Sequence, residues 1–584
     1  MVELYTVRCN LTSIRALLRR ALGLEGTWNQ NLPKFAAEDL VDSFFLGPKD
    51  YMNSTALVKI QFWILILISV FVILAAPSIW YYTPDSGIYI GTAESMVERH
   101  EYHFNGHPNL LYYPGFPSLL SWPIMLFGEN FHVLHLFCAA MVVASIWLAR
   151  TYFASSRYGL AGIVVPVIMA STTILQAQAF SILSDGSFLT ISLGALVLWR
   201  IYVEKSFHWA LLACFVLVAF APMVRFHGLF LCAAFSIALF LQAMRNSRRS
   251  PLNATMAIIG GAATLIPFGA WTLRNFEKFT PHTFNVANSY FFGLHGLPIY
   301  APGFSRVDWM GAKWKYPLHC IGLSIIDLGK NVFGKNIVKL FPNEVMFVLL
   351  IGIASFGILR WFKLATHMER AYVFLCLLFA LWWVGRGYFH YSTTRQVYLP
   401  ILPFILITAG LGMGLIHEKL ATKRYQMLST TIIIVLVLTL ILSHGVSSFI
   451  SFASRASATY YKNANIVLSK VKNYMDEKAL PGVPVATTDW GVMPFTLKRT
   501  CYQVINDDSH LLTLGRLSKY RTSYLVILDH LSVFPPYARK MVKDLPQLFT
   551  LLFEVHPDGK GPSAAVYGID LRGVRAFLNT VPKH

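Results

Sequence analysis

The sequence has little charge and few cysteines. Asp, Glu, Lys and Arg make up 13% of its 584 residues, whereas 55% are hydrophobic. The seven cysteines form no CxxC pair and most lie inside apolar runs, so neither a zinc site nor a disulfide framework is expected. The net charge of +20 is spread in short Lys and Arg groups between apolar runs. That spacing is typical of membrane topology, so we expect no nucleic-acid partner.

What the sequence has instead is a series of long apolar runs, several of them near the ~20 residues that cross a bilayer. They predict a polytopic α-helical membrane protein with about 11 transmembrane helices. The predicted spans are residues 57–77, 131–152, 160–178, 184–203, 207–221, 226–244, 254–272, 343–360, 371–386, 397–416 and 427–450. Lys and Arg gather in alternate connections, which places the N-terminus in the cytoplasm and, for an odd number of spans, the C-terminus outside. In a bacterium this membrane would be the inner (plasma) membrane.

This topology divides the chain into three predicted domains. Residues 1–55 are a cytoplasmic segment, in which residues 12–23 have one apolar helical face that suits either the membrane surface or the protein's own cytoplasmic loops. Residues 56–452 form the transmembrane domain, with outer loops at 78–117 and 273–342. Residues 453–584 are predicted to form a small extracytoplasmic α/β domain, with a helix at 458–476 and strands at 483–487, 524–528, 551–555 and 565–569.

Two aspartates lie at the outer ends of predicted spans. Asp85 follows Pro84 in the first outer loop, and Asp185 begins the span at 184–203. Neither has a basic neighbour in the sequence, and ionisable groups at this depth usually face a polar cavity. Both are therefore candidate catalytic residues, with Asp85 as the general base. The alternative for each is that it caps the helix that it begins.

Three arginines also lie at the outer side of the predicted membrane domain. Arg225, Arg274 and Arg395 lie near outer span ends, where paired guanidinium donors suit an anionic group such as a phosphate. Anchoring at the lipid headgroups is the alternative for each of them. The sequence has no compact metal motif, so no cofactor is required, and a divalent cation shared by Asp85 and Asp185 is an alternative.

The first outer loop also supplies candidate sugar-binding or acceptor-binding residues. Tyr82, Tyr112 and Tyr113 can stack on sugar faces, although tyrosines also gather at membrane interfaces for ordinary reasons. His107 lies in the same loop. The second outer loop, with its glycines and aromatic residues, is predicted to form a mobile cover over the acceptor.

Five stretches, taken in order, resemble the GT-C-fold glycosyltransferases, and in particular the protein O-mannosyltransferase and aminoarabinose transferase superfamily. They are PDSGIYIGTAESMVERHEY and NGHPNLLYYPGFPSLLSWPIMLFG in the first outer loop, SDGSFLTISLGAL from residue 184, WTLRNFEKFTPHTF from residue 271 and TTRQVYLPILPFILI from residue 393. The resemblance covers about residues 57–450 and implies a GT-C-like fold there. It also implies transfer of a sugar from a polyprenyl-phosphate or polyprenyl-diphosphate carrier to a glycan, lipid or protein acceptor outside.

The same resemblance assigns roles to single residues. Asp85 matches the catalytic aspartate of the first loop, Asp185 the second acidic position, and Arg274 and Arg395 basic positions near the donor phosphate. At two positions this chain differs from the family's pattern. O-mannosyltransferases often have Asp-Glu where this chain has Asp85 followed by serine, and aminoarabinose transferases have a lysine where Tyr113 precedes a proline.

The sequence therefore predicts a lipid-linked sugar transferase that inverts the anomeric centre. One alternative is a membrane transporter or flippase, and another is a non-catalytic scaffold subunit of a membrane complex. Transporters tend to show internal repeats and polar groups near the bilayer midplane. This chain shows no clear repeat, and its key acids lie at the outer rim of the predicted spans.

Overall fold

The computed structural model describes residues 55–109, 112–154, 158–246, 251–276, 343–385, 399–420, 459–489, 491–504, 510–529, 535–556 and 562–580. All of them belong to one compact unit, Ser54–His584. The predicted amphipathic segment at 12–23, residues 277–342 of the predicted cover at 273–342, the span at 427–450 and Arg395 lie outside the described residues.

Each predicted span within the described ranges coincides with a helix or with a broken helix. These elements are α3 (Thr55–Leu74), α6 (Phe131–Phe153), α7 (Gly159–Ser171), α8 (Thr173–Ala179), α9 (Ser184–Lys205), α10 (His208–Val224), α11 (Gly228–Asn246), α12 (Pro251–Ala263), α13 (Ile266–Phe276), α17 (Asn343–Leu364), α18 (His367–Gly385), η2 (Leu399–Ile401) and α20 (Leu402–Leu420). Among the described helices, α6, α9 and Gly228–Arg245 of α11 are long and apolar enough to cross a membrane singly. The total of about 11 spans stays a prediction.

Two predicted spans are broken rather than continuous. Thr172, in an extended conformation, separates α7 from α8. The segments Ala254–Ala263 and Ile266–Asn275 meet at an angle of 44°. At this second break the hydroxyl of Thr264 donates to the carbonyl of Gly261 over 2.6 Å. A hydroxyl that bonds back to the preceding turn offers the backbone an alternative to the helical hydrogen bond, which favours a bend.

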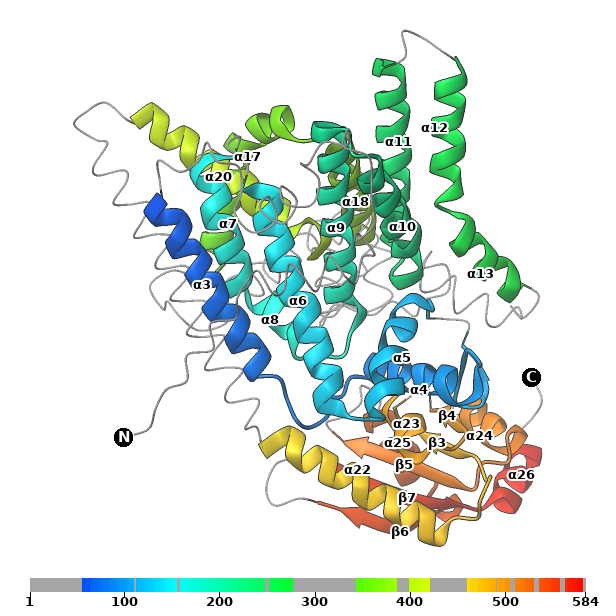
Figure 1. Cartoon of the computed structure of the whole chain (residues 1–584). Coiled ribbons are helices and arrows are strands. Elements are labelled where there is room, and N and C mark those ends of the chain that lie inside the picture. Colours follow the sequence, from blue (N-terminus) through cyan, green and yellow to red (C-terminus); the bar gives the residue numbers. More distant parts are fainter. Residues whose placement is uncertain are drawn as a thin grey trace, which may run out of the picture. The chain divides into compact units, whose positions relative to one another are not determined.

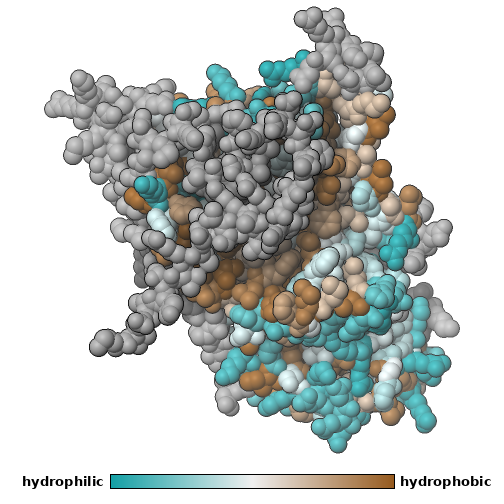
Figure 2. All heavy atoms as spheres, viewed as in Figure 1, coloured by the Kyte–Doolittle hydropathy of each residue, from teal (hydrophilic) through white to brown (hydrophobic). Residues whose placement is uncertain are grey.

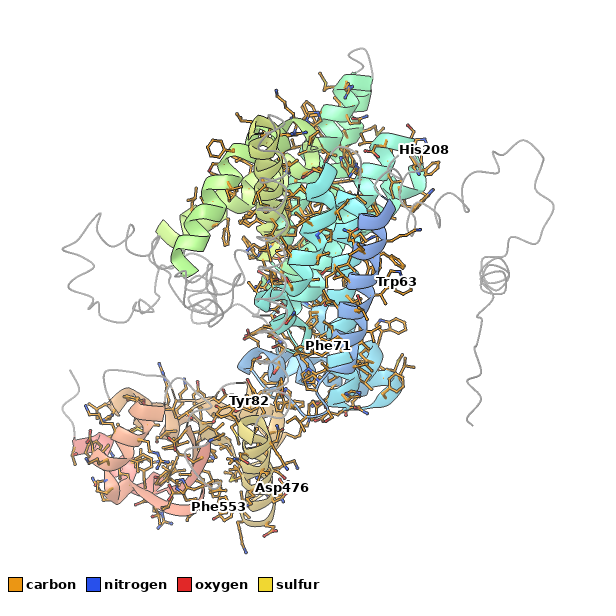
Figure 3. The ribbon with its side chains drawn as sticks, turned by 90° about the vertical axis from the view of Figure 1, so that its left-hand side faces the viewer. Trp63, Phe71, Tyr82, His208, Asp476 and Phe553 are labelled. Carbon is orange, nitrogen blue, oxygen red and sulfur yellow. The ribbon has the colours of Figure 1, made fainter. Side chains whose placement is uncertain are left out.

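The helices differ in how much surface they bury. On α3, Trp63 is 60% and Leu74 79% exposed, and Trp63 points away from the bundle in Figure 3. By contrast, α9 is buried along most of its length, with Trp199 among the largest buried side chains. Exposed apolar side chains also cover much of the described helical surface in Figure 2. Apolar helices that expose such side chains suit a lipid environment.

The first outer loop folds into two helices and a hairpin. They are α4 (Pro84–Arg99), the paired strands β1 (His103–Phe104) and β2 (His107–Pro108), and α5 (Gly115–Phe127). Asn105 and Gly106 both have positive φ, as a tight two-residue hairpin turn requires. Helix α5, at 13 residues, is too short to span a bilayer.

The C-terminal part contains a five-stranded sheet in the order β4-β3-β5-β7-β6 (Figure 1). Strands β4 (Cys501–Gln503), β3 (Val485–Thr487) and β5 (Tyr524–Asp529) are parallel to one another. Strand β7 (Ser563–Ile569) is antiparallel to both of its neighbours, β5 and β6 (Phe549–Val555). The four predicted strands are confirmed, and the three-residue β4 was not predicted.

Helices cover both faces of this sheet. On one face, Tyr474 of α22 (Thr459–Lys478) stacks on Phe553 of β6, with ring centroids 4.7 Å apart, and Figure 3 shows Phe553 on this side. On the other face, a second core joins the sheet to α24 (His510–Lys519), α25 (Pro535–Asp544) and α26 (Leu571–Thr580). The remaining elements are α23 (Val492–Leu497) and η3 (Pro546–Leu548). The sheet therefore has a core of its own.

Candidate active site

The site is built on the first turn of α4. Thr83 is the N-cap: its side chain accepts from the amide of Ser86 over 3.0 Å, and the amide of Thr83 donates to the Ser86 hydroxyl over 2.8 Å. Pro84 occupies the first helical position, where its missing N–H costs nothing. Thr83, not Asp85, therefore caps this helix, and the capping alternative for Asp85 is wrong.

The Asp85 carboxylate takes no part in capping α4 and instead accepts a hydrogen bond from Tyr112. It is partly buried, and the hydroxyl of Tyr112 donates to its Oδ1 over 2.7 Å. Burial raises the pKa of Asp85 above its ordinary value, the Tyr112 hydrogen bond and the Arg225 charge oppose that rise, and the Asp185 charge adds to it. An acid with a raised pKa and one hydrogen-bond donor is suited to take up a proton.

Asp185 has a different partner. Its Oδ1 lies 2.8 Å from Nη1 of Arg225, and both side chains are largely buried. The same Nη1 donates to the hydroxyl of Ser184 over 3.1 Å, and that hydroxyl lies 3.1 Å from the hydroxyl of Tyr89 on α4. The pair between Asp185 and Arg225 thus connects the start of α9 with the residue that follows α10 and, through Ser184, with α4.

Three of the predicted charged residues are therefore brought together: Asp85, Asp185 and Arg225. The charge of Arg225 acts on Asp85 and on Tyr113, in both cases favouring the ionised form. One of its nitrogens already contacts Asp185, so Arg225 is held in a fixed orientation. A guanidinium held in this way presents its other donors in a set direction.

The three predicted tyrosines separate in the structure. Tyr112 bonds Asp85 and meets the ring of Tyr89 edge-on, with centroids 5.1 Å apart. Tyr113 lies against α13, its ring centroid 5.1 Å from that of Trp271. Tyr82 is 7% exposed and meets the ring of Tyr461 on α22 edge-on. Tyr112 and Tyr113 therefore lie beside Asp85 and Arg225, whereas Tyr82 packs against the C-terminal part.

The remaining predicted residues are Arg274, which is exposed, and His107 and Arg395, whose side chains the structure does not describe. Arg274 is exposed in the last turn of α13. Burial raises the pKa of Tyr102, and the charge of Arg274 opposes that rise. Arg274 therefore lies close enough to Tyr102 for its charge to act there. The Tyr102 hydroxyl in turn donates to the carbonyl of Tyr112 over 2.7 Å. The side chain of His107 and all of Arg395 lie outside the described residues.

One residue beside the site was not predicted. Asp489 follows β3 and is 1% exposed, and its Oδ1 accepts from the amides of Gly491 and Val492 over 2.9 and 2.5 Å. Burial raises the pKa of Asp489 to about 6, and the charge of Asp85 contributes to the rise. Nothing in the linear sequence links residue 489 to residue 85. An aspartate directly after a buried strand was the only available signal.

Within the part of the chain that the structure describes, no group of three or more His, Cys, Asp or Glu side chains is placed to hold a metal ion. The described carboxylates at the site instead have hydroxyl, amide and guanidinium partners. The arrangement can accept a proton at Asp85 and orient a positive charge at Arg225.

The chain as a whole is similar to two sets of solved structures. The chain is similar to ArnT from Cupriavidus metallidurans bound to undecaprenyl phosphate, at 12% identity over 88% of this chain and 98% of that one, with a TM-score of 0.48. The apo form of that ArnT gives 13% identity over 89% and 98%, with a TM-score of 0.49. Also similar is the Archaeoglobus fulgidus oligosaccharyltransferase tethered to an acceptor peptide with an NVT sequon, at 12% identity over 86% and 73%, with a TM-score of 0.47.

No protein-family model and no curated protein sequence matches the chain. Identities of 12–13% are those of a distant likeness in fold. The roles of single residues therefore rest on the contacts that this chain makes.

Proposed function

We propose that this membrane protein transfers a sugar from a polyprenyl-phosphate or polyprenyl-diphosphate donor to an acceptor hydroxyl on the outer face of the membrane. The observation that carries the proposal is the state of Asp85. It begins a helix that another residue caps, its pKa is raised, and its carboxylate has a tyrosine donor and a nearby fixed guanidinium. Apolar helices around the site suit a donor with an isoprenoid tail.

The proposed reaction is a single displacement. The acceptor oxygen attacks the anomeric carbon, its proton passes to Asp85, and the bond from that carbon to the donor phosphate breaks with its electron pair on the phosphate oxygen. The products are the glycosylated acceptor and the free polyprenyl phosphate or diphosphate. Attack from the face opposite the phosphate gives inversion. A positioned base contributes about 10²–10⁴-fold to such a step.

Positive charge assists the departing phosphate. We assign Arg274 and Arg395 to that phosphate, and Arg225, oriented by Asp185, to the region between it and Asp85. Tyr112 and Tyr113 then lie where the sugar or acceptor binds, with Tyr82 and His107 as further candidates from the same loop. No metal is required, and a divalent cation between Asp85 and Asp185 is the alternative arrangement.

The test is turnover with a panel of polyprenyl-phosphate and polyprenyl-diphosphate sugars, each radiolabelled in the sugar, added to membranes that contain the full chain. Loss of label from the lipid measures transfer without knowledge of the acceptor. Asp85→Asn is expected to lower transfer by about 10²–10⁴-fold and to leave thermal stability unchanged. Glu98→Gln, an exposed acid on the same helix, is the matched control.

Full turnover by Asp85→Asn with a donor that the wild type uses would remove the proposed base. Movement of intact labelled lipid across the membrane, without loss of label, would instead favour a flippase.

A further inference from the structure

The carboxyl end of β3 lies against the first turn of α4. Strands β3 and β5 are parallel, so their carboxyl ends meet at one edge of the sheet, and Asp489 follows β3 at that edge. In open α/β sheets, residues that act on ligands are found at this edge. Here the edge faces another part of the same chain: Asp489, Gly491 and Val492 are buried, and Gly87 of α4 lies against the last two.

The two backbones approach closely at a pair of glycines. A Cβ added to Gly87 would lie 2.4 Å from the carbonyl oxygen of Gly491, a distance that real Cβ atoms do not show. Gly87 is two residues after Asp85, and Gly491 is held by the carboxylate of Asp489. A side chain at residue 87 would therefore separate the catalytic turn of α4 from the Asp489 turn.

Contacts on both sides of this glycine pair hold the two backbones together. Lys498, at the end of α23, lies 2.5 Å from Glu94 of α4. The side-chain amide of Asn105, in the hairpin turn, donates to the carbonyl and accepts from the N–H of Cys501, over 2.7 and 2.8 Å. Phe495 meets Trp80, just before α4, edge-on at 4.8 Å. The Asp489 turn is thus part of an extended interface.

We propose that the C-terminal sheet contributes a positioning residue to the candidate active site, namely Asp489, which shapes the turn that supports Asp85 on α4. The role rests on the proposed function, because it assumes that Asp85 is the base. Asp489 acts in two ways: its Oδ1 organises the turn that Gly87 contacts, and its negative charge repels the carboxylate of Asp85.

The charge effect has a definite sign. The titratable groups that act on Asp489 or feel its charge are Tyr82, Asp85 and Cys501. Besides Asp489, the groups that act on Asp85 are Tyr112, Arg225 and Asp185. Repulsion between two carboxylates is mutual and disfavours the ionised form of each. Removal of the Asp489 charge therefore lets Asp85 ionise at lower pH.

Two variants of residue 489 separate the two contributions. Asp489→Asn keeps an oxygen that can accept both amides and removes the charge. Asp489→Ala removes both. Gly87→Ala tests the close approach from the other side, and Gly515→Ala in α24, where an added Cβ meets nothing within 4 Å, is its matched control.

The first readout does not need activity: hydrogen exchange of the α4 amides in the purified full chain in lipid nanodiscs. We expect Asp489→Ala and Gly87→Ala to exchange at residues 87–89 on the order of tenfold faster than wild type. Asp489→Asn and Gly515→Ala are expected to match wild type. Unchanged exchange in both Asp489→Ala and Gly87→Ala would overturn the positioning role.

The second readout is the pH profile of label loss in the donor assay. We expect Asp489→Ala to lower kcat by about 10²-fold, as misplacement of a catalytic group does. Asp489→Asn should retain kcat at its optimum while its acidic limb moves to lower pH. A residue with a purely structural role would not shift the acidic limb. An acidic limb at the wild-type pH in Asp489→Asn would therefore overturn the charge effect.

The two proposals fail in different ways. Full turnover by Asp85→Asn overturns the proposed function whatever the exchange data show. An inactive Asp85→Asn together with wild-type exchange and wild-type kcat in Asp489→Ala overturns only the role of Asp489.

Discussion

Helices α4 and α9 begin alike and are used differently. Each has an aspartate at its second residue, Asp85 in α4 and Asp185 in α9. In α4 the side chain of Thr83 caps the helix, whereas Leu183 precedes α9 and provides no side-chain cap. The carboxylate of Asp85 has a tyrosine donor, and that of Asp185 has an arginine. The partner, and not the position in the helix, distinguishes the proposed base, Asp85, from Asp185, which orients Arg225 in the proposed site.

The two helices also differ in what surrounds them. Helix α9 is packed among its neighbours α6 and α10, and its Asp185 lies in a buried ion pair. Helix α4 lies between the bundle and the C-terminal sheet, contacting α5 on one side and α23 on the other (Figure 1). Loss of the Asp185 carboxylate should therefore lower stability as well as release Arg225, whereas Asp85→Asn should act on the chemistry alone.

The largest expected effect on stability is at α9. Asp185→Ala leaves Arg225 buried without its partner, which should lower the free energy of unfolding by about 3–5 kcal/mol. The double variant Asp185→Ala with Arg225→Ala should recover part of that loss. Asp476→Ala, which removes an exposed pair with Lys472 and a longer contact of 3.5 Å with Arg499, is the control and should cost at most about 1 kcal/mol. The measurement is unfolding of the purified protein in detergent, and equal losses for the two aspartates would contradict the buried pair.

At α4, Tyr112→Phe removes the hydroxyl that bonds Asp85. A hydrogen bond to a charged group contributes about 1.5–3 kcal/mol to the free energy of unfolding. Because this bond lowers the pKa of Asp85, its loss should raise that pKa and move the acidic limb of the transfer profile to higher pH. The shift is opposite to the one expected for Asp489→Asn. A profile that stays in place would show that Tyr112 does not act on the reacting form of Asp85.

The contact of α4 with the sheet predicts a pH-dependent stability. Burial raises the pKa of Glu94 to about 8, Glu129 adds to the rise, and Lys498 opposes it. The folded protein therefore binds the Glu94 proton more tightly than the unfolded chain does. As a result, the free energy of unfolding is highest below the unfolded-state pKa near 4.5 and falls as the pH rises to about 8. Glu94→Gln should flatten this loss, which is at most about 1.4 kcal/mol per pH unit. Melting temperatures of both proteins across that range test it, and parallel curves would contradict it.

The smallest expected effect is at the cap itself. Thr83→Ala should lower the free energy of unfolding by about 1 kcal/mol, and Thr83→Ser should retain most of it. If Asp85 replaced the lost cap in Thr83→Ala, the unfolding midpoint would stay near wild type and transfer would fall. Unfolding and label loss measured on the same preparation separate these results.

Much of the fold could be predicted from apolar periodicity. Runs such as 131–152 and 184–203 are long and continuous, and the structure has helices there. Breaks could not be predicted, because Thr172 and Thr264 are unremarkable in sequence and act through a backbone conformation and a hydrogen bond. Strand β4 is too short for a period-2 pattern to be visible.

The candidate site was predictable in part. Asp85, Asp185 and Arg225 could be selected because isolated charges at outer span ends are uncommon. Their pairing could not be predicted, since Asp185 and Arg225 come from different helices. Asp489 follows a strand some four hundred residues away from Asp85, and only the folded sheet brings it near.

The side chain of Asn105 has a consequence for solubility. Strand β4 is at the edge of its sheet, and the outward-facing N–H and carbonyl of Cys501 would otherwise be open to a strand from another molecule. One carboxamide occupies both groups, as a neighbouring strand would. The hairpin of the first outer loop thus protects this edge from self-association between copies of the chain.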